Sequence, residues 1–174
     1  QAAVRLGSIR SFMKAEIQAN TDALTGLPNR RATEEHIGAA LARRERLSVA
    51  IADLDKFKQL NDTHGHEAGD RALRMFAEVV RESIREDDWG GRWGGEEFVV
   101  HLPGLTAREA ASVLERIREN LAAACERTDG PDVTVSIGVV DDAAGQTLDE
   151  LVSLADDCLY SVSYTHLTLP TRRF

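Results

Sequence analysis

Two aspartates near the end of an apolar run could bind a divalent cation. The run 47–55 is short and rich in β-branched residues, which predicts a buried strand. Asp53 and Asp55 are two positions apart in it, so their side chains should point to the same face. Mg²⁺ takes such oxygen ligands and keeps room for substrate phosphates. The alternative is that an Asp at this strand end caps the next helix.

A second pair of acids follows two glycines. Gly94 and Gly95 can adopt the positive φ values of a two-residue hairpin turn, and they allow a bulky substrate to approach the backbone. Glu96 and Glu97 come directly after them, where they can lie beside the end of the run 47–55. Alone, this sequence is also typical of a solvated turn. Both acidic pairs together favour a metal-phosphate site.

The polar stretch between these acids carries groups that suit a nucleotide. Lys58, on a predicted loop, could neutralise a phosphate, although a surface lysine is the commoner explanation. Asn61, His66 and Asp70 combine donors and acceptors that match the edge of guanine. Helix capping around Gly65 and His66 is the alternative for the histidine.

Helical and strand periodicities predict the elements that must position these residues. The predicted helices span about 29–46, 66–85, 106–127 and 147–160, and the strands span 47–55, two segments around Gly94 and Gly95, and 132–140. The resulting β-α-β-β-α-β order, followed by a helix, predicts an α+β, ferredoxin-like fold. Its antiparallel sheet would carry helices on one face.

Composition excludes several classes of protein. Lys and Arg number 21 and Asp and Glu 29, a net charge of −8 that argues against binding a nucleic acid polymer. The sequence has no run of 18 apolar residues, so we expect no membrane contact by this segment. Cys125 and Cys158 lack zinc-site spacing, which favours a reducing, cytoplasmic location. Because the first residue is Gln1, we expect a piece of a longer protein.

Four ordered motifs together resemble the GGDEF family of diguanylate cyclases: DALTGLPNRR, ADLDKFKQLNDTHGHEAGD, RWGGEEF and TVSIGV. The resemblance covers Asp22 to Tyr160 and includes the GGEEF variant of the namesake motif. It implies a nucleotide-cyclase-like fold. It also implies that two GTP molecules, one on each subunit of a homodimer, condense to cyclic di-GMP and two pyrophosphates.

The resemblance further implies a role for each candidate residue. Mg²⁺ or Mn²⁺ would be bound by Asp53, the backbone carbonyl of Leu54, Glu96 and Glu97. Glu96 would also be the general base. GTP would be bound by Asn61, His66 and Asp70 at guanine and by Lys58 at the phosphates.

A second, inhibitory site is suggested by an RxxD sequence shortly before GGEEF. There Arg85 and Asp88 would bind the product cyclic di-GMP. Charged residues at a helix end are the alternative explanation.

The flanks differ from the core. Residues 1–21 are expected to be a signalling helix, with a stripe formed by Leu6, Ile9, Met13 and Ile17. Residues 22–160 would be the catalytic domain. Residues 161–174 depart from the family, with Ser163 where a phosphate-contacting Lys is expected, which suggests a non-native tail.

Two other functions compete with catalysis. A catalytically weak domain that binds GTP or cyclic di-GMP is favoured by Ser163 but opposed by the intact acids. An RNA-binding module of the same topology would need exposed aromatic residues on its sheet and a basic surface. The charge of −8 opposes that function.

Overall fold

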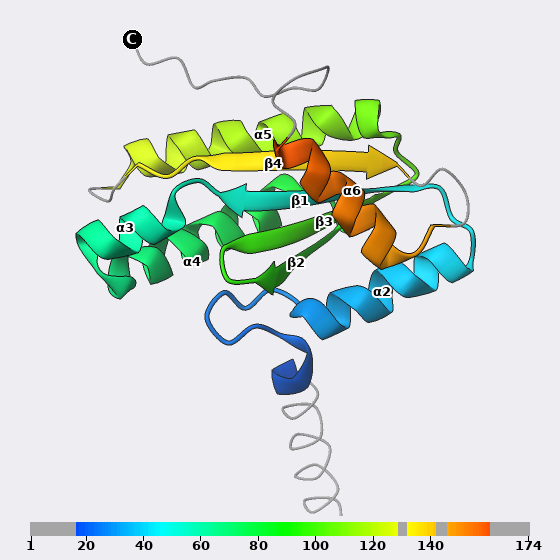
Figure 1. Cartoon of the computed structure of the whole chain (residues 1–174), viewed down its shortest axis with the longest axis horizontal. Helices are drawn as coiled ribbons and strands as arrows, with labels where there is room; N and C mark the ends of the chain where they lie inside the picture. The colour runs from blue at the N-terminus through cyan, green and yellow to red at the C-terminus, as the bar shows by residue number, and fades with distance from the viewer. Residues whose placement is uncertain (1–16, 129–131, 142–145, 161–174) are drawn as a thin grey trace, which may run out of the picture.

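The computed structural model describes residues 17–128, 132–141 and 146–160 (Figure 1). Its four strands form one antiparallel sheet in the order β2-β3-β1-β4. The strands are β1 (Leu47–Leu54), β2 (Trp89–Gly94), β3 (Glu97–Pro103) and β4 (Val135–Asp141). The helices are α2 (Arg30–Ala42), α3 (Phe57–His64), α4 (His66–Ser83), α5 (Ala107–Glu126) and α6 (Leu148–Tyr160). The predicted α+β class and antiparallel ferredoxin-like sheet are confirmed.

Helices cover both faces of this sheet, so the prediction of one covered face was wrong. Alternate residues of β1 enter two separate cores: Ala50, Ala52 and Leu54 pack in one, and Leu47, Val49 and Ile51 in the other. Figure 1 shows α4 and α5 on one side of the sheet and α2 and α6 on the other. A strand buried on both faces has a continuous apolar sequence, and β1 has one.

The polar stretch after β1 contains a helix that the sequence analysis treated as a loop. This helix, α3, has no buried residue, and only Phe57 and Leu60 pack partly against the core. Its weak apolar pattern explains why periodicity missed it. Lys56, at φ 55°, starts α3, and Gly65, at φ 81°, separates it from α4. Lys58 therefore lies on a helix.

Local capping sets several helix starts close to their predicted places. The Asn29 side chain accepts a hydrogen bond from the backbone N–H of Ala32 at 3.0 Å. Thr106 and Glu109 form a capping box at the start of α5. At α3 no side chain caps the helix, so the capping alternative for Asp53 and Asp55 is not supported.

Several predicted boundaries differ from the structure by a few residues. Helix α2 ends at Ala42 rather than near 46, α4 ends at Ser83 rather than near 85, and β4 begins at Val135 rather than at 132. At the C-terminal end of α2, Arg44 has a positive φ of 56°. This backbone conformation ends the helix before the predicted boundary.

The hairpin turn lies one residue later than expected. Gly94 is still in β2, where it pairs with Glu97, so the two turn residues are Gly95 and Glu96. Of the two glycines only Gly95 has a positive φ, of 25°. The turn therefore places Glu96 at its tip and Glu97 in a strand.

Some predictions concern residues outside those that the structure describes. They include Leu6, Ile9 and Met13 of the apolar stripe and the tail 161–174 with Ser163. From the stripe only Ile17 is described, and its side chain is 62% exposed. Among the described helices, none is both long and apolar enough to cross a bilayer.

Candidate functional site

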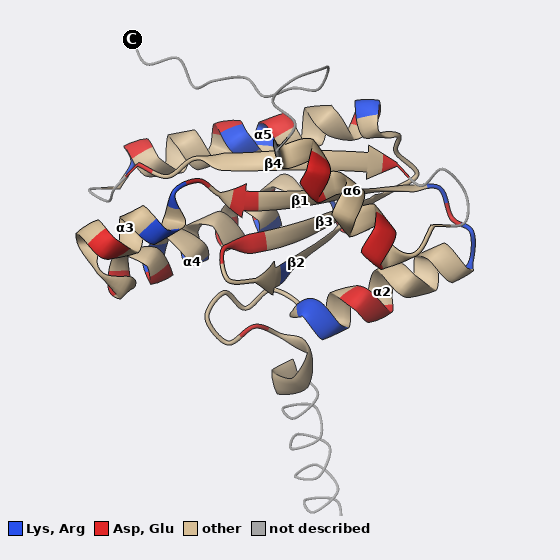
Figure 2. Cartoon of the chain, in the orientation of Figure 1, with Lys and Arg blue, Asp and Glu red and all other residues tan. Residues whose placement is uncertain are grey.

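The two acidic segments meet at one edge of the sheet. Asp53 and Glu97 are direct partners in the β1–β3 ladder. The backbone N–H of Leu54 donates to the carbonyl oxygen of Glu96 at 3.3 Å. Figure 2 shows the acidic end of β1 beside the acidic start of β3. The fold thus brings Asp53 beside Glu96 and Glu97, which follow it by more than forty positions in the sequence.

The Asp53 carboxyl lies among other negative groups. Burial raises its pKa to about 6, and the nearby charges of Glu96, Glu97, Asp55 and Asp156 act in the same direction. Like charges held close together cost free energy unless a cation or a proton neutralises them. This edge of the sheet therefore favours a cation.

The donor chemistry of this edge fits a hard divalent metal. Carboxylate oxygens are the ligands that Mg²⁺ prefers, and burial together with the neighbouring carboxylates raises the pKa of Asp53, an unfavourable environment that such an ion would relieve. Within residues 17–128, 132–141 and 146–160, no three or more Asp, Glu, His or Cys side chains are gathered as closely as ligands of one ion. The acids are therefore neighbours without forming a complete coordination shell.

Asp55 has a different role from the one its spacing predicted. Its carboxylate accepts hydrogen bonds from the hydroxyls of Thr134 at 2.5 Å and Ser136 at 2.6 Å. Its backbone N–H donates to the carbonyl of Thr134 at 2.9 Å. Asp55 thus fastens the end of β1 to β4, and the expected cation-binding pair reduces to Asp53.

The four predicted nucleotide-binding residues lie on α3 and α4. Asn61 is half-buried on α3, and its Oδ1 is buried without a hydrogen-bond partner. Asp70, on α4, forms an ion pair with Arg74 at 3.8 Å. Lys58 and His66 are exposed. No side chain caps α4 at Gly65, so the capping alternative for His66 is not supported.

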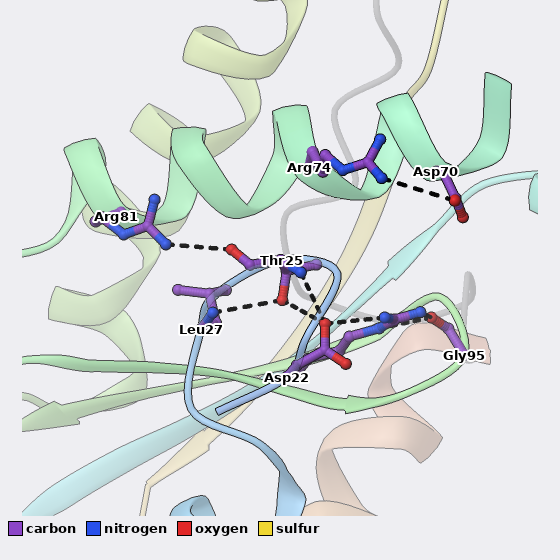
Figure 3. A network of polar contacts seen from close by, with 8 residues as sticks. Asp22, Thr25, Leu27, Asp70, Arg74, Arg81 and Gly95 are labelled. Carbon is purple, nitrogen blue, oxygen red and sulfur yellow. Dashed lines mark hydrogen bonds and ion pairs between the residues drawn. The ribbon is translucent and has the colours of Figure 1, made fainter. Parts of the chain in front are cut away.

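A polar network connects the GGEEF hairpin to the loop 22–29, and the sequence analysis missed it (Figure 3). The Arg92 guanidinium donates to Asp22 Oδ1 at 3.0 Å and, through Nε and Nη2, to the carbonyl oxygen of Gly95 at 3.1 and 2.7 Å. Asp22 Oδ1 also accepts from the backbone N–H and the hydroxyl of Thr25 at 2.9 and 2.7 Å. Arg92 therefore ties the turn that carries Glu96 to the loop 22–29.

The pKa of Asp22 reflects this network. Burial alone would raise its pKa, but the hydrogen bonds from Thr25 and Arg92 outweigh burial and hold the pKa below its usual value. A third link connects the loop to α4, because the guanidinium of Arg81 donates to the Thr25 carbonyl at 3.3 Å. The motifs DALTGLPN and RWGGEEF contain Asp22 and Arg92, but nothing in the sequence pairs them.

The RxxD segment forms a turn just after α4. The backbone N–H of Arg85 donates to the carboxylate of Asp88 at 2.9 Å, and the N–H of Asp88 donates to the carbonyl of Arg85 at 3.1 Å. The Arg85 side chain is exposed. Asp88 thus stabilises a turn at the end of α4, which agrees with the alternative explanation of charged residues at a helix end. Arg85 faces solvent.

The sheet order, the paired helical layers and the acids beside the hairpin define an α+β domain with a candidate metal-phosphate site at one edge of its sheet. The family model described as diguanylate cyclase, GGDEF domain, matches residues 19–166. The chain belongs to the GGDEF family of diguanylate cyclases.

Relatives and solved structures agree with this assignment. Diguanylate cyclase DgcP of Pseudomonas aeruginosa is 39% identical over 149 residues, which cover 82% of this chain and 22% of that protein. DgcM of Escherichia coli is 40% identical over 149 residues, covering 83% of this chain and 36% of that protein. This chain thus spans well under half the length of either relative.

Among solved structures, the coiled coil and GGDEF domain of DgcB from Caulobacter crescentus, in complex with c-di-GMP, superposes with a TM-score of 0.81. It is 28% identical, with coverage of 92% of this chain and 89% of that one. The diguanylate cyclase SiaD of Pseudomonas aeruginosa, in complex with its activator SiaC, gives a TM-score of 0.77 at 36% identity, covering 91% and 64%.

Proposed function

We propose that this chain condenses two molecules of GTP into cyclic di-GMP and releases two pyrophosphates. The observation that carries the proposal is the meeting of Asp53, Glu96 and Glu97 at one sheet edge in a chain of the GGDEF family. In each half of the reaction a ribose 3′-oxygen forms a bond to an α-phosphorus, and the bond from that phosphorus to the pyrophosphate breaks.

The acids of this edge would supply the proton transfer and hold a divalent metal. Asp53, the Leu54 carbonyl, Glu96 and Glu97 are the proposed ligands of Mg²⁺ or Mn²⁺. Such an ion, when bound, neutralises phosphate charge and polarises the α-phosphate. Glu96, at the tip of the turn, is the proposed general base that takes the proton of the attacking 3′-hydroxyl.

The helical pair beside the acids would hold the nucleotide. We assign guanine to Asn61, His66 and Asp70 and the phosphates to Lys58, which is exposed on the first turns of α3. Each chain would present one GTP, so the reaction needs two chains facing each other as a homodimer. Positioning both nucleotides in this way supplies much of the acceleration.

The domain limits and the inhibitory site are part of the same proposal. Residues 22–160 would be the catalytic domain of a cytoplasmic protein, 1–21 a signalling helix, and 161–174 a non-native tail. Arg85 and Asp88 would bind cyclic di-GMP and inhibit turnover, a proposal supported by the exposed Arg85 side chain. Calorimetry with cyclic di-GMP on Arg85→Ala tests this, with the exposed Arg71→Ala as the control. Equal affinities would contradict it.

The direct test is a mass-spectrometric assay for cyclic di-GMP after incubation of the chain with GTP and Mg²⁺. We expect Glu96→Gln to lower the rate by about a hundredfold or more, because a general base typically contributes that factor. Glu126→Gln removes the same charge from an exposed site at the end of α5 and should leave the rate unchanged. Equal rates for Glu96→Gln and the unaltered chain would reject the assignment of the base.

A domain that binds a nucleotide without turnover is the second candidate function. Ser163, in place of the expected lysine, is the observation that favours it. Tight binding of GTP or cyclic di-GMP by calorimetry, with no product after hours in a sample shown to be dimeric, would establish this function in place of catalysis.

A further inference from the structure

Glu96, the proposed general base, lies at the tip of the hairpin turn beside a glycine that packing does not hold. Gly95 is exposed, and a methyl group there would meet nothing within 4 Å. Hydrogen bonds from outside the turn nevertheless reach the peptide groups on both sides of Glu96. The Arg92 guanidinium donates to the Gly95 carbonyl, and the backbone N–H of Leu54 donates to the Glu96 carbonyl at 3.3 Å. Both peptide groups are therefore fixed in orientation.

Fixing these two peptide groups determines the direction in which the Glu96 side chain begins. A residue has only two soft backbone dihedrals, and each is a rotation between its Cα and one of the rigid peptide planes that flank it. With both planes held by hydrogen bonds, the Cα–Cβ bond of Glu96 has one direction. The carboxylate thus projects from a fixed point beside Asp53, the ladder partner of Glu97.

The Arg92 side chain is suited to hold the Gly95 carbonyl because its guanidinium is a rigid fork of donors. Nε and Nη2 donate to this one oxygen, while Nη1 donates to Asp22 (Figure 3). The backbone N–H of Arg92 also donates to the carbonyl of Pro28 at 2.9 Å. The side chain is only 16% exposed, so solvent competes little for these contacts. A lysine, with one ammonium nitrogen, could not reproduce this fork.

We propose that Arg92 is a positioning residue for the reaction, which acts through the Gly95 carbonyl to direct Glu96 toward the 3′-hydroxyl. The inference rests on the proposed function, since it takes Glu96 as the general base. It gives the guanidinium a part in turnover in addition to its part in stability. Because the proposed contacts to the nucleotide lie on α3 and α4, loss of the fork should lower kcat and leave the KM for GTP nearly unchanged.

The test is steady-state kinetics of the whole chain with GTP and Mg²⁺, below the unfolding temperature of every variant. We expect Arg92→Lys, which keeps the charge but loses the fork, to lower kcat about tenfold or more, because small misplacements of a reacting group are costly. Arg43→Lys makes the same change in an exposed pair with Glu45 and should leave kcat and KM unchanged. Asp22→Asn weakens the same ion pair but leaves the fork on Gly95, so it should lower the Tm and largely preserve kcat.

A double variant tests whether the effect passes through Glu96. In a Glu96→Gln chain, Arg92→Lys should lower kcat no further, because the base that it positions is already gone. Additive losses in the double variant, or full kcat in a folded Arg92→Lys, would overturn the inference. So would losses of kcat in Arg92→Lys and Asp22→Asn that merely follow their losses of stability.

A second variant keeps the test usable if Arg92→Lys does not fold. Arg92→Gln likewise lacks the fork of donors, and the same loss of kcat at unchanged KM is expected from it. Absence of cyclic di-GMP from the unaltered chain is a different outcome. It would reject the proposed function itself, whereas an active chain that tolerates the loss of the fork would reject only the role of Arg92.

Discussion

Two aspartates of this domain, Asp22 and Asp53, are both partly buried but are held in opposite electrostatic environments. Asp22 accepts hydrogen bonds from Thr25 and Arg92, which hold its pKa below the usual value despite burial. Burial and the charges of Glu96 and Glu97 raise the pKa of Asp53 to about 6. The first carboxylate is satisfied within the fold, and the second is crowded by like charges.

The difference separates a structural carboxylate from a functional one. A satisfied carboxylate contributes to stability and needs no further partner. A carboxylate crowded by like charges costs stability, and folds retain such groups at sites that act on ligands. In this chain the two are connected, because Arg92 holds both Asp22 and the carbonyl of Gly95 in the hairpin turn.

The largest effect on stability is expected from removing Arg92, the cation that pairs with Asp22. Arg92→Ala leaves the partly buried Asp22 without its cation and should lower the free energy of unfolding by about 3 kcal/mol. Denaturant unfolding followed by the fluorescence of Trp89 and Trp93 measures this. Arg43→Ala, which breaks the exposed pair with Glu45, should leave the free energy of unfolding nearly unchanged. Equal losses would show that the network is not structural.

A buried histidine, His101, should make the stability of the fold depend on pH between about 4 and 6.5. His101 is 2% exposed, neither ring nitrogen has a hydrogen-bond partner, and burial together with the nearby His36 lowers its pKa from 6.5 to about 4. The His36 ring, on α2, is 5.3 Å away between centroids, and the charge of Glu45 opposes the shift. The folded state therefore binds fewer protons than the unfolded state in this range.

Stability should accordingly rise with pH from about 4 to 6.5, be fully present above 6.5, and be lost as the pH falls toward 4. The change is up to about 3 kcal/mol, and the raised pKa of Asp53 offsets part of it. Unfolding of His101→Leu over the same pH range should show a flatter profile. Parallel profiles for His101→Leu and the unaltered chain would contradict the assignment.

The smallest effect on stability is expected from removing the negative charge of Asp53, which lies among other carboxylates. Asp53→Asn removes one of several neighbouring negative charges and, without a divalent metal, should raise the free energy of unfolding by about 1 kcal/mol after solvent screening. Millimolar Mg²⁺ should raise the Tm of the unaltered chain more than that of Asp53→Asn. Destabilisation by Asp53→Asn in metal-free buffer would show that Asp53, like Asp22, is structural.

Much of the fold could be predicted because its signals are local. The continuous apolar run of β1 and the apolar stripes of α4 and α5 follow from hydrophobic burial. Thr106 with Glu109 marks a helix start within four residues of sequence. Helix α3 could not be predicted in this way, because it buries none of its residues and is stabilised by packing against α4.

By itself the sequence determined which acids are present, which strands and most helices form, and that a hairpin joins the strands on either side of the glycine pair. Only the tertiary structure decided that Asp55 binds β4, that helices cover both faces, and that Arg92 joins Asp22 to the turn. Periodicity and capping act within a few residues, whereas these contacts join segments as far as 81 positions apart. Which residues make these long-range contacts depends on how the helices pack on the sheet, and a local sequence pattern contains no information about that packing.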